Sequence, residues 1–319
     1  MKRRFFVSVL AAACLLTGAG CAGRPAESSG TESGVYYAFT DDAGREVVLP
    51  EAPQKVAVLF SSFADIWKTA GGTVNITVGE SVGRGFADES AVLVDAGAGK
   101  TINTESLIAA EPDLIIGSLD IAAQADAVKL AAQAGFPAAA FKVESFADYL
   151  RVLKICTDIT GDAEAYQTYG TAVQGRVDEV LQKAQQSGQV QPREILFIRA
   201  GSKASATKAK TAKDHFACAM LQEMGTHNIA DDAPVLLDGL SLEEILLRNP
   251  DYIFISTMGD EQAAIDYLEG VFAGEEWQVL TAIQEKHYTF LPKELFHFKP
   301  NARWDEAYRY LYDLLYPSA

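Results

Sequence analysis

The sequence predicts an α/β fold with two Rossmann-like lobes that are joined by a single long helix, and a ligand cleft between the lobes. Three observations lead to this prediction. Two segments of the first half recur in the second half, short apolar runs alternate with helical segments in each half, and one long helical segment separates the halves. The expected organisation is an N-terminal lobe over residues 36–162, a connecting helix over 163–187 and a C-terminal lobe over 188–319.

The recurring segments indicate a duplicated lobe. Residues 63–76 (FADIWKTAGGTVNI) and 216–229 (FACAMLQEMGTHNI) are identical at six positions. In the same order, residues 102–118 (INTESLIAAEPDLIIGS) and 240–256 (LSLEEILLRNPDYIFIS) share five further positions. This spacing is the size of a domain and far exceeds the roughly 20–50 residues of solenoid repeats. We therefore expect two similar lobes in tandem.

The first half supplies the elements of a parallel sheet. Apolar runs at Val56–Phe60, Leu114–Ile116 and Ala138–Phe141 are typical of strands that are covered on both faces. Helices are expected over Ser61–Ala70 and Asn103–Ala110. Because helices and strands alternate, the strands are expected to run parallel, with ligands bound beyond their carboxyl ends.

The second half repeats this pattern. Strands are expected at Ile195–Ile198 and Tyr252–Ile255, with a helix over Ser241–Leu247. In both halves a Pro-Asp pair, at residues 112–113 and 250–251, breaks the helix directly before its strand.

One long helix is predicted between the halves, over residues 163–186 (AEAYQTYGTAVQGRVDEVLQKAQQ). Its apolar and aromatic residues recur at helical spacing. They are Tyr166, Tyr169, Val173, Val177, Val180 and Leu181. A helical connection permits little relative motion, unlike a glycine hinge, so we expect a rigid link and not merely a surface helix of the first lobe.

The first residues indicate export. Residues 1–20 begin with three basic residues, continue with an apolar run that is too short to span a bilayer, and end in small residues, which is the pattern of an export signal. Cys21 follows Gly-Ala-Gly and resembles the lipidated cysteine of the bacterial lipobox, although Gly18 stands where Leu is usual. Residues 21–35 are small and polar and predict a flexible, lipidated tether. The alternative is ordinary cleavage and a free secreted protein.

The charge balance restricts the partners. The chain has 27 Lys and Arg against 43 Asp and Glu, a formal net charge of −16, so neither nucleic acid nor an anionic lipid surface is an expected partner. Membrane contact is expected only through the lipid anchor. Outside the signal and lipobox only Cys156 and Cys218 remain, which is no disulfide framework.

Four segments carry a resemblance to a known family that covers nearly all of residues 39–317. They are FTDDAGREVVLPEAPQKVAVL, INTESLIAAEPDLIIGS, MLQEMGTHNIADD and HYTFLPKELFHFKPNARWDEAY. The chain resembles the periplasmic-binding proteins of ABC importers for ferric siderophores, haem and cobalamin. The resemblance implies a monomeric binding protein on the outer face of the bacterial cytoplasmic membrane, which delivers its ligand to a permease dimer with ATPase subunits.

A cationic segment is the main candidate for ligand recognition. Residues 199–215 (RAGSKASATKAKTAKDH) separate a strand of the second half from the repeated helix, whereas only two residues do so in the first half. The segment is either a solvated loop or, from its place at the strand's carboxyl end, part of the cleft. The full set of predicted ligand-binding residues is Ser61, Ser62, Arg84, Ser118, Lys142, Arg199, Lys203, Lys208, His215, Ser256, His297, Lys299 and Arg303.

Aromatic side chains are expected to add apolar walls to the cleft, although two of them, Phe63 and Trp67, are also candidates for the core. The full set is Phe63, Trp67, Phe141, Phe296 and Trp304.

An anionic iron chelate of the siderophore type suits such a cleft best. Haem is the alternative, because its propionates would also seek cations and its iron would accept an axial ligand from His297, His215 or a tyrosine. Cobalamin, which needs fewer cations, comes third. No cofactor and no metal bound directly by the protein are expected, because all four histidines fall in the second half whereas related zinc carriers draw histidines from both lobes.

A lipoprotein enzyme or an adhesin on the same lobes is less favoured. The sequence has no G-x-S-x-G elbow and no Cys/His pattern that indicates a nucleophile. We therefore do not expect an enzyme.

Two acidic residues are predicted to contact the permease. Glu105 and Glu243 occupy equivalent places in the repeat, in the first turn of their helices. An acid there also stabilises the helix dipole by about 0.3–1 kcal/mol, which is the alternative explanation. In the resembling family one glutamate from each lobe meets arginines of the permease.

Overall fold

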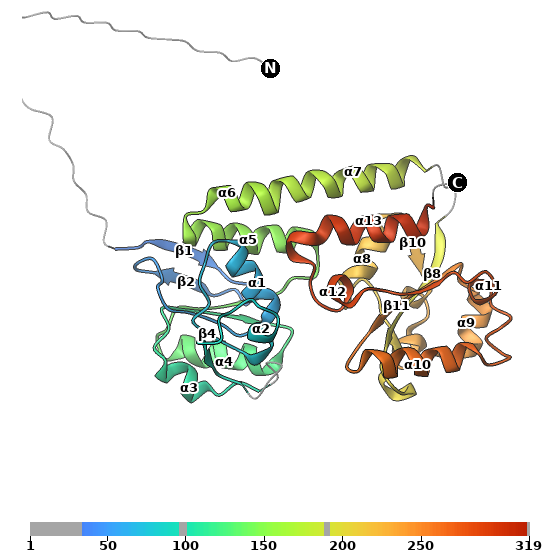
Figure 1. The fold of residues 1–319 in the computed structure, drawn as a ribbon, viewed down its shortest axis with the longest axis horizontal. Coiled ribbons are helices and arrows are strands. Elements are labelled where there is room, and N and C mark those ends of the chain that lie inside the picture. Colours follow the sequence, from blue (N-terminus) through green and yellow to red (C-terminus); the bar gives the residue numbers. More distant parts are fainter. Residues whose placement is uncertain (1–33, 96–100, 188–191, 318–319) are drawn as a thin grey trace, which may run out of the picture. The chain divides into compact units, whose positions relative to one another are not determined.

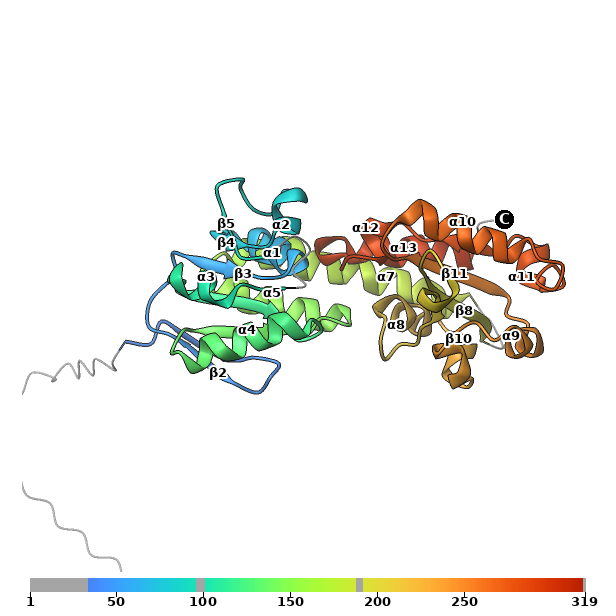
Figure 2. The same cartoon turned by 90° about the horizontal axis from the view of Figure 1, so that it is seen from below.

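The computed structural model describes residues 34–95, 101–187 and 192–317. The predicted export signal, Cys21 and nearly all of the predicted tether lie outside these ranges. Figures 1 and 2 show the two lobes and the hairpin that precedes them in perpendicular views.

The N-terminal lobe contains a parallel five-stranded sheet with the strand order β5-β4-β3-β6-β7. The three predicted strands are β3, β6 and β7, and all their residues are buried. The antiparallel hairpin of β1 (Tyr37–Thr40) and β2 (Glu46–Leu49) precedes the sheet. The remaining bounds are β3 Val56–Val58, α1 Ser61–Thr69, β4 Ile76–Thr77, α2 Gly79–Gly83, β5 Val92–Leu93, α3 Thr104–Ala109, β6 Leu114–Ser118, α4 Ala122–Gln133, β7 Ala138–Phe141 and α5 Phe146–Thr160.

The C-terminal lobe contains a second sheet, in which β10-β8-β11-β12 are parallel and β9 pairs antiparallel with β8. The bounds of the strands are β8 Arg193–Ala200, β9 Lys208–Ala209, β10 Thr226–Asn228, β11 Tyr252–Thr257 and β12 Tyr288–Phe290. The α-helices are α8 Phe216–Glu223, α9 Leu242–Arg248, α10 Glu261–Phe272, α11 Thr281–Gln284, α12 Lys293–Phe296 and α13 Trp304–Leu315. Short 3-10 turns cover Ala204–Ala206, Ile229–Asp231, Pro234–Leu237 and Asn301–Arg303.

The two lobes share one topology. The order β4-β3-β6-β7 in the first lobe corresponds to β10-β8-β11-β12 in the second. The repeated aspartates act alike, since Asp113 accepts hydrogen bonds from the backbone N–H groups of Gln54 and Lys55, and Asp251 accepts one from Glu194. Each ties the start of one strand to the start of its neighbour. The predicted pair of similar α/β lobes is confirmed.

The connecting helix is continuous over the predicted range but contains a π-helical turn. It consists of α6 (Ala163–Tyr166), the π turn Gln167–Thr171 and α7 (Ala172–Gln186). The carbonyl of Tyr169 in the π turn accepts a hydrogen bond from the hydroxyl of Tyr149, at 3.0 Å. The helix begins against α5 of the first lobe, and α7 packs along α13 of the second (Figure 1).

A single hydrophobic cluster extends through both lobes. The ring of Phe146 in the first lobe lies 5.9 Å from that of Trp304, tilted by 57°. The Trp304 ring contacts Phe216 of the second lobe edge to face, at 5.4 Å between centroids. This shared core explains why residues 34–319 form one compact unit despite having two sheets. It also overturns one expectation: the five aromatic side chains expected to line the cleft are at most 2% exposed and belong to this core.

Candidate ligand-binding site

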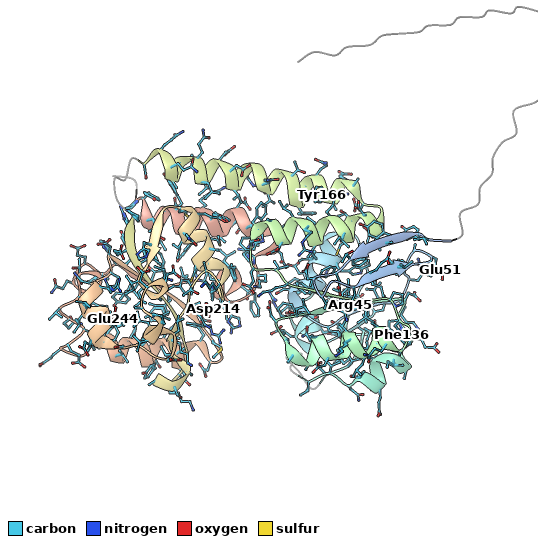
Figure 3. The ribbon with its side chains drawn as sticks, turned by 180° about the vertical axis from the view of Figure 1, so that it is seen from behind. Arg45, Glu51, Phe136, Tyr166, Asp214 and Glu244 are labelled. Carbon is cyan, nitrogen blue, oxygen red and sulfur yellow. The ribbon has the colours of Figure 1, made fainter. Side chains whose placement is uncertain are left out.

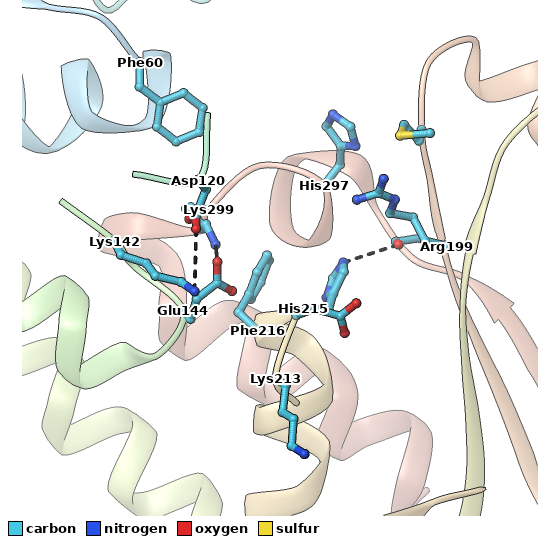
Figure 4. A pocket seen from close by; sticks show the side chains of 13 residues that line it. Phe60, Asp120, Lys142, Glu144, Arg199, Lys213, His215, Phe216, His297 and Lys299 are labelled. Carbon is cyan, nitrogen blue, oxygen red and sulfur yellow. Dashed lines mark hydrogen bonds and ion pairs between the residues drawn. The ribbon is translucent and has the colours of Figure 1, made fainter. Parts of the chain in front are cut away.

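A pocket of about 330 Å³ lies between the lobes, at the carboxyl ends of both sheets (Figure 4). This volume is at the lower end of the range for small-molecule sites. In the first lobe its lining residues follow β3, β6 and β7. In the second lobe two lie near the ends of β8 and β11, one follows β11, and the others lie at or just before the start of α8 or after α12. Parallel sheets place the carboxyl ends of their strands at one edge, where these lining residues meet. They are Phe60, Asp120, Lys142, Glu144, Arg199, Lys213, Asp214, His215, Phe216, Ser256, Met258, His297 and Lys299.

Six of the predicted ligand-binding residues meet in this pocket. They come from sequence positions up to 157 residues apart, and the two sheets bring them together. They are Lys142, Arg199, His215, Ser256, His297 and Lys299.

Arg199 presents the cation of the C-terminal wall. Its backbone lies near the end of β8, between Lys208 of β9 and Ser256 of β11. Within the described ranges no carboxylate forms an ion pair with the Arg199 guanidinium. An unpaired, partly buried guanidinium at a pocket wall is suited to a bidentate contact with a ligand carboxylate or a similar anion.

His215 is a neutral wall residue. Its Nδ1 accepts a hydrogen bond from the N–H of Ala217 at the start of α8, so the proton lies on Nε2, which faces Ser256 Oγ at 3.4 Å. Burial lowers the pKa of His215 to about 3, and the cations Lys299 and Arg199 act in the same direction. With its proton on Nε2, this imidazole donates to the cleft side and does not offer a lone pair there.

His297 has the opposite tautomer. Its Nδ1 lies 2.9 Å from the carbonyl oxygen of Thr257, and because a carbonyl only accepts, Nδ1 carries the proton. The Nε2 of this pocket-lining imidazole therefore has a lone pair. Burial lowers the pKa of His297, although its hydrogen bond to Thr257 opposes that shift. A neutral imidazole that is oriented through Nδ1 is the form that binds metals or accepts hydrogen bonds.

Acidic residues of the N-terminal wall neutralise two lysines. Lys142 lies 3.6 Å from Asp120, and Lys299 lies 3.1 Å from Glu144. Burial raises the pKa of Glu144, Lys299 lowers it in part, and the neighbouring Asp120 carboxyl raises it further. The pocket thus has four cationic and three acidic side chains, and its lining is more acidic than expected from the sequence.

Sequence reasoning missed these acids because it searched for positive charge. Asp120 lies two residues after the end of β6 and Glu144 three residues after the end of β7, at the edge where ligands bind. Their place just beyond the carboxyl ends of two predicted strands would have identified them as candidate pocket residues. Asp214, the third acid of the pocket, pairs with Lys210 at 2.7 Å.

The segment 199–215 is a hairpin and a turn and not one long loop. β8 continues through Ala200, and β9 returns antiparallel to it, with Arg199 opposite Lys208. Lys203 and Lys208 lie on this hairpin, outside the pocket. Lys213 is in the pocket lining, but in Figure 4 its side chain is directed away from Arg199.

The remaining predicted binding residues lie outside the pocket. Ser118 and Ser62 are buried, and Ser61 donates a hydrogen bond to Glu80. Arg84 donates to Ser61 Oγ at 3.1 Å. Arg303 forms an ion pair with Glu306 on the surface, at 2.8 Å.

Residues 298–301 cross from the second lobe to the first beside the pocket. The ring of Phe298 lies 3.6 Å from the Arg84 guanidinium carbon, which is a cation–π contact. Lys299 reaches Glu144, and Asn301 donates to the carbonyl of Ser62 and to Asp65, each at 2.8 Å. Three nearby side chains of one segment therefore hold the first lobe.

Glu105 and Glu243 are exposed and lie outside the pocket. Asn103 caps the helix of Glu105 by accepting from Ser106 N–H, whereas Ser241 makes no side-chain capping bond before Glu243. Because α3 and α9 each run back to the start of a strand, their first turns lie toward the carboxyl side of the sheets.

Within the described ranges no group of three or more His, Cys, Asp and Glu is arranged to hold a metal ion. In the same ranges no helix has the length and apolar character that a membrane span requires. Cys156 and Cys218 are free and buried, and burial raises the pKa of both thiols.

Comparison with known proteins places this architecture in a family. The sequence profile of the periplasmic binding protein family matches residues 56–295. No curated protein matches the sequence. The chain therefore belongs to the periplasmic binding proteins, which are solute-binding proteins that work outside the cytoplasm.

Solved structures with the same fold support this assignment. Staphylococcus aureus SirA in complex with staphyloferrin B has 16% identity and a TM-score of 0.67, over 88% of this chain and 98% of that one. The apo periplasmic heme-binding protein RhuT from Roseiflexus sp. RS-1 has 15% identity and a TM-score of 0.65, over 82% and 98%. A periplasmic solute-binding protein from Veillonella parvula has 16% identity and a TM-score of 0.66, over 87% and 85%.

Proposed function

We propose that the protein captures a ferric siderophore-type iron chelate in the interlobe pocket and delivers it to the permease dimer of an ABC importer. The observation that carries the proposal is the unpaired guanidinium of Arg199 in a pocket of small-molecule size at the carboxyl ends of two parallel sheets. An anionic chelate would form an ion pair with this guanidinium, whereas a neutral sugar would leave its charge uncompensated.

The lysines of the opposite wall add to this preference. Lys142 and Lys299 already pair with acids, but both remain in the pocket lining and can share their three ammonium protons with a ligand. Phe60 supplies a half-buried aromatic surface, and the largely buried Phe216 also lines the pocket. Together these groups suit a chelate with carboxylate or catecholate oxygens and a partly apolar body.

Native mass spectrometry of the protein purified from its own cells tests this proposal. We expect a one-to-one complex whose added mass and isotope pattern contain one ferric ion and an organic chelator. A ligand without iron, such as a sugar or an amino acid, would contradict it.

Haem is the second candidate, and His297 is the observation in its favour. The hydrogen bond of Nδ1–H to Thr257 leaves Nε2 of this imidazole free to coordinate the iron of haem, whereas His215 carries its proton on Nε2. Tight binding of haemin with a shifted Soret band, lost on His297→Ala and retained on His287→Ala, would favour haem over the siderophore.

The remaining parts of the proposal concern delivery. We propose that Cys21 is lipidated and that the protein is tethered to the outer face of the cytoplasmic membrane. The exposed Glu105 and Glu243, one on each lobe, are proposed to meet cationic residues of the permease. Their equivalent places in two similar lobes fit a two-fold partner.

A further inference from the structure

Glu144 lies where an anionic ligand would bind. Its Oε1 accepts a hydrogen bond from Lys299 Nζ at 3.1 Å, and both residues line the interlobe pocket. The Lys299 side chain is 14% exposed and that of Glu144 25%, so this ion pair is well shielded from water. The Lys299 ammonium also lies 5.1 Å from the ring centroid of Phe216.

A second ion pair adjoins the first. Asp120 and Lys142 lie 3.6 Å apart on the same wall, and the carboxyl groups of Asp120 and Glu144 are near each other in Figure 4. The backbone N–H of Glu144 donates to Asp148 of α5, which in turn lies 3.7 Å from Arg151. The charged groups around Glu144 are therefore Lys299 from the crossing segment, Asp120 and Lys142 from the strand ends, and Asp148 from α5.

We infer that Glu144 acts as an internal counter-ion of Lys299 and that protonation of Glu144 ends this pairing. Anion binding in the pocket is therefore coupled to proton uptake at Glu144. The inference rests on the proposed function, because it concerns the same pocket. In the ionised state, a ligand oxygen near Lys299 meets the negative charges of Glu144 and Asp120. When Glu144 is protonated, Lys299 is free to pair with the ligand anion instead.

The electrostatics of the cluster support this coupling. Two carboxylates in one partly buried place repel each other, and one of them takes up a proton more readily than usual. Burial and the neighbouring Asp120 raise the pKa of Glu144, although Lys299 opposes them. An anion that binds at Lys299 adds a further negative charge beside Glu144 and raises that pKa again. By linkage, anion affinity must then increase as pH falls.

The test uses sulfate, whose charge stays constant between pH 4.5 and 7.5. The protein is titrated with sodium sulfate at constant ionic strength, balanced with chloride, and binding is followed by the amide chemical shifts around Lys299 and Phe216. For the wild-type protein we expect the dissociation constant to fall about tenfold from pH 7.5 to pH 4.5, as for one unit of pKa change. Glu144→Gln is expected to bind at pH 7.5 as tightly as the wild-type protein does at pH 4.5.

Glu244→Gln is the matched control. Glu244 also forms an ion pair with a side-chain exposure of 24%, to Arg248 at 2.9 Å, but it lies in α9 outside the pocket (Figure 3). This variant should retain the pH response of the wild-type protein. Lys299→Met should lose the pH response, and any sulfate that still binds at the unpaired Arg199 should bind equally at both pH values. Circular dichroism checks that each variant is folded.

Two results would overturn the inference. One is a pH response of Glu144→Gln that equals that of the wild-type protein. The other is no sulfate binding by Glu144→Gln at pH 7.5, since an uncovered Lys299 must attract a small dianion whatever the natural ligand is. Both results are independent of any iron chelate, so the inference and the proposed function can fail separately.

Discussion

Asn301 is a buried residue whose side chain links the two lobes. It is 1% exposed and has a positive φ of 52°, a conformation that Asn tolerates better than most residues. Its amide N–H₂ donates to the carbonyl of Ser62 and to the Asp65 carboxylate. Burial raises the pKa of Asp65, and the hydrogen bond from Asn301 opposes that shift. The ionised form of the Asp65 carboxyl is therefore stabilised by the hydrogen bond from the Asn301 amide.

We predict that Asn301→Gly destabilises the protein by about 1–3 kcal/mol, because the half-buried Asp65 carboxylate and the Ser62 carbonyl lose their donor. Glycine keeps the positive φ without strain, so this variant removes the amide without straining the backbone. Asn301→Ala should cost more, since it adds the strain of the left-handed conformation. Urea unfolding monitored by circular dichroism measures both values. A Gly variant as stable as the wild-type protein would contradict the role of the amide.

His215 makes the stability of the protein depend on pH. Its pKa is about 3 in the folded protein because of burial, against an ordinary value of 6.5. Between these values the unfolded chain binds a proton and the folded protein does not, so stability falls as pH falls. The slope is at most about 1.4 kcal/mol per pH unit for one proton.

The variant His215→Asn checks this prediction. Asn keeps an acceptor for the N–H of Ala217 at the start of α8 but does not titrate. We expect the loss of stability from pH 6.5 downward to be shallower in this variant than in the wild-type protein, measured by urea unfolding at several pH values. Parallel curves for the two proteins would show that His215 is not the group responsible.

At the scale of elements, equivalent helices of the two lobes present equivalent acids. Glu105 lies in the first turn of α3 and Glu243 in the first turn of α9, and both are exposed. Neither residue forms an ion pair with a described residue. Duplication of the lobe explains why the two acids occupy equivalent places. Under the proposed delivery to a permease dimer, each lobe would offer the same charge to one of two like subunits.

We predict that Glu105→Gln with Glu243→Gln abolishes ligand import by whole cells but leaves ligand affinity of the purified protein unchanged. Gln keeps the size of the side chain and removes only the charge. Glu111→Gln with Glu179→Gln serves as a control for the same change in net charge, since Glu111 precedes β6 and the exposed Glu179 lies in the connecting helix α7. Import at the unmodified rate by the Glu105 and Glu243 variant would leave these residues as acids that stabilise their helices, worth about 0.3–1 kcal/mol each.

At the scale of the whole molecule, the sequence was sufficient to predict the architecture. Repeated segments and short buried strands specify two parallel sheets, and the helical spacing of residues 163–186 specifies the connection. The domain limits stay a prediction. The helical spacing did not predict the π turn at Gln167–Thr171, where the Tyr169 carbonyl accepts a hydrogen bond from the distant Tyr149 hydroxyl.

The pocket was predicted only in part, for a physical reason. Lys142, Arg199 and Ser256 could be predicted because they lie at or near the carboxyl ends of predicted strands, which meet at one edge of each sheet. Which charges neutralise one another depends on side-chain contacts between the lobes, such as Lys299 with Glu144. The sequence pattern does not encode that pairing, and the cleft therefore looked more cationic than it is.

Titration of the purified protein with ferric siderophores tests whether the interlobe pocket binds an anionic iron chelate. Carboxylate, catecholate and hydroxamate chelates are added separately, with quenching of tryptophan fluorescence as the signal. We expect one-to-one binding of an anionic chelate, weakened about tenfold or more by Arg199→Ala, since a hydrogen bond to a charged group contributes about 1.5–3 kcal/mol. Added salt should weaken binding as well. The exposed Arg309→Ala should bind as the wild-type protein does. The proposed function would be contradicted if no ferric chelate binds, or if neither salt nor Arg199→Ala changes the binding.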